Sequence, residues 1–121
     1  MATPKAATKV EDARLPAHLE VAGLIRSVQA EGGFATVLKR GERDAGTVLV
    51  LTMYRGKNAV LFERMPQLDG TRPYIAAKRE NSENPAEIGE YVEKRHRQDP
   101  DIWVVEVDVV DAERFVASKA R

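Results

Sequence analysis

Two acidic pairs surround the chain's only tryptophan, in the stretch QDPDIWVVEVD that runs from 98 to 108. Asp99 and Asp101 flank a proline, and Glu106 and Asp108 are two apart in a run typical of a strand. Side chains two apart on a strand point to the same face, so such a pair can bind a divalent cation or divide acid and base roles. A solvated or ion-paired strand face gives the same pattern, and we favour that structural interpretation for both pairs.

The segment RGERDAG is the second place where chemistry is conceivable. It lacks the Lys-Ser/Thr end of a phosphate-binding P-loop, and it lies between two expected strands instead of opening onto a helix. We expect a hairpin turn in which Asp44 accepts backbone N–H groups. An anion contact by Arg40 and Arg43, which flank the loop, is the functional alternative.

Other catalytic and metal-binding patterns are weak. The chain has no cysteine, and none of its serines lies in a glycine elbow between a strand and a helix. His18 and His96 fall at the ends of two different expected helices, which suits a structural role better than ligation. We therefore predict no metal, no cofactor and no catalytic residue.

Hydrophobic periodicity and turn residues define the elements that would position these side chains. A helix is expected over 16–31 and a second one from Asn84, as N-cap, with Pro85 in its first turn. Pro100 ends that helix, and Asp101 is expected to bond backbone at the corner. Strands are expected at 34–40, 47–54, 59–65, 72–78 and 102–110.

The order α-β-β-β-β-α-β predicts an α+β fold with two layers, a mostly antiparallel sheet of about five strands and two main helices. The first four strands are expected to form an antiparallel meander, and the second helix then returns the fifth strand. We expect a flexible tail at 1–14, a single domain at 15–110 and a short helix or tail at 111–121. Trp103 is expected to pin the last strand against a helix, because an indole buries about 150–250 Å².

Charge and composition restrict the partners. Lys plus Arg and Asp plus Glu number 19 each, so the formal net charge is zero. This balance gives no strong signal for nucleic-acid binding, and it leaves self-association unopposed. No apolar run approaches the about 20 residues that span a bilayer, so we expect no membrane association. A cytoplasmic location fits the absence of cysteine.

Three segments resemble the bacterial DUF1491 family of unknown function. They are RLPAHL at 14–19, GGFATVLKRGERDAGTVLV at 32–50 and DPDIWVVEVD at 99–108. In place of a tryptophan expected between 55 and 80, this chain has Tyr74. The resemblance implies a short cytoplasmic bacterial protein with a shared fold, and it implies no activity.

Two functions fit these observations. We favour a non-enzymatic binding or interaction domain, with a second copy or another protein as its partner. The alternative is a small enzyme or ligand-binding protein with a polar site near Arg40, Asp44, Asp101 and Glu106. Trp103 completes the set of candidate binding residues, and the sequence alone does not decide whether the protein is an enzyme.

Overall fold

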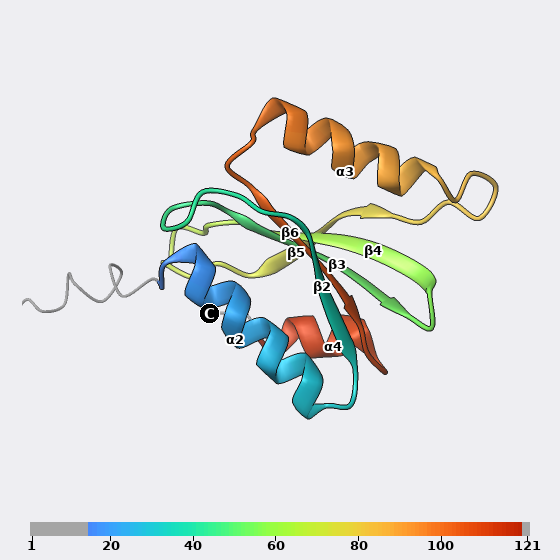
Figure 1. Ribbon diagram of the computed structural model, residues 1–121, viewed down its shortest axis with the longest axis horizontal. Coiled ribbons are helices and arrows are strands. Elements are labelled where there is room, and N and C mark those ends of the chain that lie inside the picture. The colour runs from blue at the N-terminus through green and yellow to red at the C-terminus, as the bar shows by residue number, and fades with distance from the viewer. Residues whose placement is uncertain (1–14, 120–121) are drawn as a thin grey trace, which may run out of the picture.

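The computed structural model describes residues 15–119 (Figure 1). The expected tail at 1–14 and the last two residues of the segment 111–121 lie outside the described residues. The expected α+β class and the order α-β-β-β-β-α-β are confirmed, and a short helix follows the last strand. The bounds are α2 Ala17–Ala30, β2 Phe34–Lys39, β3 Val48–Tyr54, β4 Lys57–Arg64, β5 Tyr74–Arg79, α3 Glu87–Gln98, β6 Trp103–Asp108 and α4 Ala112–Ala117.

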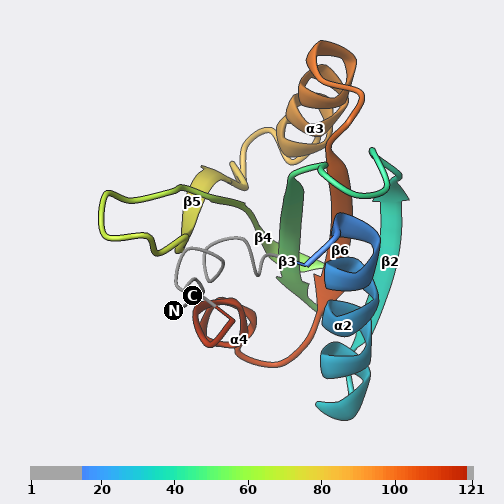
Figure 2. The ribbon, with the colours of Figure 1, turned by 90° about the vertical axis from the view of Figure 1, so that its left-hand side faces the viewer.

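The five strands form one sheet in the order β2-β6-β3-β4-β5. The antiparallel meander is confirmed for β3, β4 and β5, but the expected pairing of β2 with β3 is wrong. The last strand, β6, lies between them, antiparallel to β2 and parallel to β3, so the sheet is mixed (Figure 2). The reason is burial: Val104, Val105 and Val107 are fully buried, and a strand that is apolar on both faces is most stable in the middle of a sheet.

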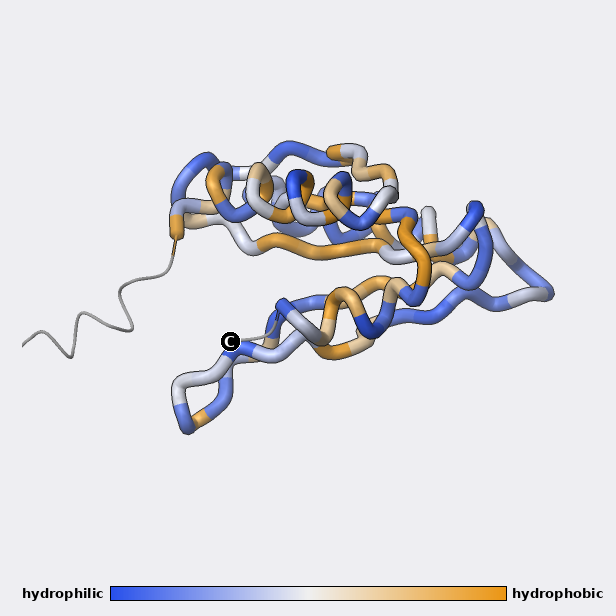
Figure 3. The backbone as a smooth tube through the Cα atoms, turned by 90° about the horizontal axis from the view of Figure 1, so that it is seen from below, coloured by the Kyte–Doolittle hydropathy of each residue, from blue (hydrophilic) through white to orange (hydrophobic). Residues whose placement is uncertain are grey.

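Helices lie on both faces of the sheet, which differs from the expected two layers. On one face, Val28 of α2 and Phe115 of α4 belong to a cluster with Val105. On the other face, Val92 of α3 belongs to a second cluster with Leu61. Figure 3 shows an apolar stretch running through the middle of the molecule and mostly hydrophilic loops projecting from it. The sheet therefore has no helix-free face, although α3 is the only helix packed on its side among the described residues.

Ion pairs hold α3 across the sheet. Lys39 of β2 lies 2.8 Å from Glu93, and this contact lowers the pKa of the Glu93 carboxyl below its ordinary value. Arg95 donates two hydrogen bonds to the carboxylate of Glu63 in β4, at 2.8 and 3.0 Å. The bidentate Arg95–Glu63 pair, with both side chains less than a quarter exposed, stabilises the packing of α3, whereas the Lys39–Glu93 contact, with Glu93 55% exposed, contributes little.

The start of α3 corrects one expectation. The helix begins at Glu87 with Ala86 as N-cap, two residues after the expected cap at Asn84, and no side chain caps it. Asn81 accepts the N–H of Glu83 at 2.9 Å and forms an isolated bridge with Asn84. The two asparagines therefore form a local turn before the helix, and Asn84 does not act as its N-cap.

Candidate functional site

The loop 40–47 joins β2 to β3 and must pass over the start of β6, which lies between those two strands. Backbone contacts make this crossing tight. A Cβ atom on either Gly41 or Gly46 would overlap the carbonyl oxygen of Asp101. The N–H of Glu42 donates to that same carbonyl at 2.9 Å. The two glycines are therefore required by close backbone approach, and the segment is a crossing rather than the expected hairpin turn.

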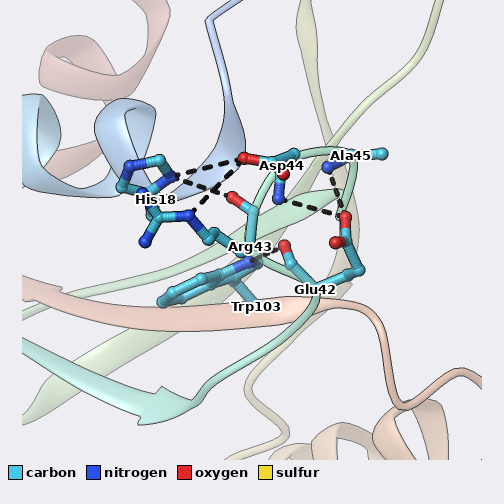
Figure 4. A network of polar contacts seen from close by, with 6 residues as sticks. All are labelled: His18, Glu42, Arg43, Asp44, Ala45 and Trp103. Atoms are coloured by element: carbon cyan, nitrogen blue, oxygen red, sulfur yellow. Dashed lines mark hydrogen bonds and ion pairs between the residues drawn. The ribbon is translucent and has the colours of Figure 1, made fainter.

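Trp103 fastens the loop from below (Figure 4). Its indole N–H donates to the carbonyl of Glu42 at 2.8 Å, and the residue is only 3% exposed. The guanidinium of Arg40 lies over the ring, 5.3 Å from its centroid. The indole thus packs in the cluster beneath α2, with its one polar group satisfied by the loop.

The loop also caps α2. The N-cap residue of this helix, Pro16, makes no side-chain hydrogen bond, so the first N–H groups of the helix need other acceptors. The carbonyls of Arg43 and Asp44 accept the N–H groups of His18 and Ala17, each at 2.9 Å. The ring Nδ1 of His18 lies 3.1 Å from the carbonyl of Arg43. Loop carbonyls therefore satisfy donors that a helix start leaves unpaired.

The carboxylate of Glu42 shapes the loop from within. Its Oε1 accepts the N–H groups of Asp44, at 3.0 Å, and Ala45 (Figure 4). The Asp44 carboxylate is exposed, 3.9 Å from His18 and 3.8 Å from Arg43. The backbone role expected of Asp44 thus belongs to Glu42, which the sequence analysis did not single out.

The corner before β6 is built in a similar way. Asp99 accepts the N–H of Asp101 at 3.1 Å, so the Asx bond expected of Asp101 is made by Asp99. Asp101 contributes its carbonyl, which accepts the N–H of Glu42. Within 15–119 no three His, Cys, Asp or Glu side chains are grouped so that they could hold a metal ion.

Four of the five candidate residues meet at this crossing: Arg40, Asp44, Asp101 and Trp103. Glu106 does not. It lies three residues beyond Trp103, about 10 Å along the strand, and its side chain is on the opposite face of the sheet. It is half-buried and forms no hydrogen bond or ion pair with any described residue. Its neighbour on that face, Asp108, accepts the N–H groups of Arg55 and Gly56, at 2.8 and 3.1 Å, and so stabilises the turn between β3 and β4.

A second polar cluster lies where α2 and α4 meet the sheet. The Arg64 guanidinium donates to the carbonyls of Arg72 and Lys119, at 3.1 and 3.0 Å, and lies 3.4 Å from Glu20. It also covers the ring of Tyr74, 4.5 Å from the centroid. Burial raises the pKa of the Tyr74 phenol above its ordinary value. This cluster ties the end of α4 to the sheet, which is a structural task.

An exposed apolar surface was missed by the sequence analysis. The strand β2 is an edge of the sheet, and its outward side chains Phe34, Thr36 and Leu38, here called the β2 strip, are exposed. Phe34 is 76% exposed and Leu38 is 40% exposed. The alternation of the strand, with Ala35 and Val37 packed inward, was the available signal.

A cavity of about 300 Å³ lies away from the loop crossing and from the β2 strip, and its lining contains none of the five candidate residues. It is lined by Asn58, Ala59, Val60, Arg79, Glu80, Ser82 and Glu113. Arg79 and Glu113, both in this lining, form an ion pair at 3.1 Å.

No helix among residues 15–119 is long and apolar enough to cross a membrane.

Comparisons with known proteins agree with this architecture. The family model described as "Protein of unknown function (DUF1491)" matches residues 15–117. A crystal structure of a DUF1491 family protein from Caulobacter crescentus is 38% identical, with a TM-score of 0.74, and the match covers 84% of this chain and 94% of that one. A solution structure from A. tumefaciens is 30% identical, with a TM-score of 0.70, covering 86% of this chain and 93% of that one. A search of curated proteins found no match.

Proposed function

This chain belongs to the DUF1491 family of proteins of unknown function, and from that premise we propose that it is a non-enzymatic interaction domain that binds a protein partner through β2. The observation that carries the proposal is the β2 strip on an open sheet edge, with Phe34 76% exposed. Edge strands present unpaired backbone groups, and adjoining apolar side chains favour strand addition by a partner.

The polar groups near Trp103 support the same conclusion, because they already form hydrogen bonds within the chain. The indole N–H, the carbonyls of Glu42 and Asp101 and the carboxylate of Glu42 all bond other parts of this chain. Catalytic groups need free acceptors or donors directed at a substrate. These contacts connect α2, the crossing loop and β6, so their role is structural.

The bacterial cytoplasm is the proposed location. Relatives come from Caulobacter crescentus and A. tumefaciens, and the chain contains no cysteine. A reducing compartment suits such a chain.

Ligand binding at the crossing is the second candidate, because Arg40, Asp44 and Asp101 meet there. A thermal-shift screen of the purified chain against metal ions and metabolites tests it, since a ligand of the native state raises the melting temperature. An increase that Arg40→Ala abolishes would support this candidate over the first.

The test of the main proposal is photo-crosslinking in cells, with a benzophenone amino acid in place of Phe34. We expect one defined adduct, identified by mass spectrometry. The same probe at Leu68, an exposed residue outside the strands, is the control. No adduct at position 34, or the same adducts at both positions, would overturn the proposal.

A further inference from the structure

We infer that the partner bound by β2 is a second copy of this chain, through antiparallel pairing of the two β2 strands about a two-fold axis at Thr36. This inference rests on the proposed function, because it names the occupant of the surface proposed there. The pairing would join two five-stranded sheets into one continuous sheet, with like faces aligned, since opposite residues of an antiparallel pair lie on the same face.

The two edges of the sheet differ in charge. From Phe34 to Leu38, β2 carries no charged residue, and the ammonium of Lys39 is paired with Glu93 of its own chain. The other edge, β5, carries Lys78 and Arg79, whose charges are also paired within the chain, with Glu87 and Glu113. Charged residues on an edge strand discourage pairing with another chain. β5 has two charged residues among its six and β2 has one, at its end, so β2 is the less protected edge.

The side chains of β2 are self-complementary about Thr36. A two-fold axis there places Phe34 of each copy opposite Leu38 of the other and brings the two Thr36 residues together. All three side chains are exposed in the isolated chain. Exposed and half-buried residues alternate along the strand, which places Leu38 with Phe34 and Thr36, although Leu38 lies in a bulge between Val37 and Lys39. Aromatic–aliphatic and Thr–Thr cross-strand pairs both stabilise antiparallel strands.

Charge is complementary at the two ends of the same pairing. Glu31 is exposed at the C-terminus of α2, just before β2, and no basic residue lies in the last turn of that helix. Its side chain forms no ion pair with any described residue. Arg40, just after β2, is also exposed; its guanidinium lies over the Trp103 ring and forms no ion pair with any residue in 15–119. The two-fold axis sets the acidic end of each copy, with its negative helix terminus, against the basic end of the other.

Size decides how strong this association can be. Six residues of edge strand with one row of exposed side chains make a small interface, so the dimer should dissociate on dilution. The zero net charge leaves no overall repulsion to oppose it.

Cysteine cross-linking of the full chain tests both the partner and the register, because the chain has no cysteine of its own. Thr36→Cys should form a disulfide-linked dimer under mild oxidation, since residues on a two-fold axis bring their Cβ atoms within reach of an S–S bond. Phe34→Cys and Leu38→Cys should cross-link strongly only when the two variants are mixed. Ala77→Cys, exposed on β5, is the matched control and should stay monomeric.

The outcomes separate the inference from the function on which it rests. A wild-type chain that is monomeric over a concentration series by native mass spectrometry, or cross-links that form equally at Ala77, overturn the second copy as partner. If position 34 still captures one defined different protein in cells, the interaction function stands without the dimer. If position 34 captures nothing and Thr36→Cys does not cross-link, both are overturned.

Discussion

The indole N–H of Trp103 donates a 2.8 Å hydrogen bond to the carbonyl of Glu42, a residue 61 positions earlier in the chain. This contact joins the last strand to the loop that crosses over it. The loop carbonyls next to Glu42 cap α2, so one cluster unites all three segments of the DUF1491 resemblance. The segment DPDIWVVEVD at 99–108 therefore has a structural role, because its residues hold the crossing loop in place.

Trp103→Phe should lower the free energy of unfolding by about 1–3 kcal/mol, because the carbonyl of Glu42 loses its buried donor. Arg40→Met keeps that hydrogen bond and removes only the guanidinium above the ring, so its cost should stay below about 1 kcal/mol. Urea unfolding followed by circular dichroism compares the two variants. Equal effects would show that the ring contact, and not the hydrogen bond, fastens the loop.

Gly41→Ala should strongly destabilise the chain, because its Cβ would overlap the backbone carbonyl of Asp101. Gly89→Ala is the control: a Cβ there meets nothing within 4 Å, and the residue lies in α3. Alanine in a helix is favoured over glycine by roughly 0.5–1 kcal/mol, so the control should be more stable than the wild type. Melting temperatures of both variants give the test, and a harmless Gly41→Ala would contradict the tight crossing.

Asp108→Ala should cost about 0.5–1.5 kcal/mol, because the exposed N–H groups of Arg55 and Gly56 lose their acceptor to water. Arg55 has a φ of 54°, a conformation that suits glycine. Arg55→Gly should therefore recover part of the loss in the double variant. Denaturant unfolding of the single and double variants measures this, and a double variant less stable than Asp108→Ala would show that the turn is not strained at Arg55.

Stability should fall at high pH through Tyr74, whose phenol has its pKa raised by burial above the ordinary 10.0. The unfolded chain loses this proton first, so ionisation favours unfolding. The stability that the neutral phenol contributes is fully present below the pKa of Tyr74 in the unfolded chain. It is lost as the pH rises through the higher pKa of Tyr74 in the folded chain. Tyr74→Phe should show a smaller loss of unfolding free energy between about pH 8 and about pH 11. Identical pH profiles for the two chains would contradict a buried phenol.

Local signals in the sequence predicted local structure well. The expected helix 16–31 is α2 within one residue at each end, and Pro100 does separate α3 from β6. The dipeptide Asp69-Gly70, typical of turns, lies in a turn of the structure, with Gly70 at a φ of 90°. Each of these depends on residues close together in the chain, where propensity and turn chemistry decide the outcome.

Contacts between distant segments could not be read in this way. Nothing near β2 indicates that β6 will separate it from β3, because the pairing is decided by the burial of a strand about 60 residues later. The same limit applies to the candidate site. The sequence named Arg40, Asp44, Asp101 and Trp103, and only the crossing explains why they meet and why Glu106 lies on the opposite face.

Hydrogen exchange of the backbone amides along a dilution series tests most directly whether the open edge of β2 is the binding surface. At high concentration the outward amides of Phe34–Lys39 should exchange slowly, and dilution should speed them, while Tyr74–Arg79 on the other edge stays unchanged. Protection that changes with concentration in Tyr74–Arg79, or in neither edge, would contradict this account.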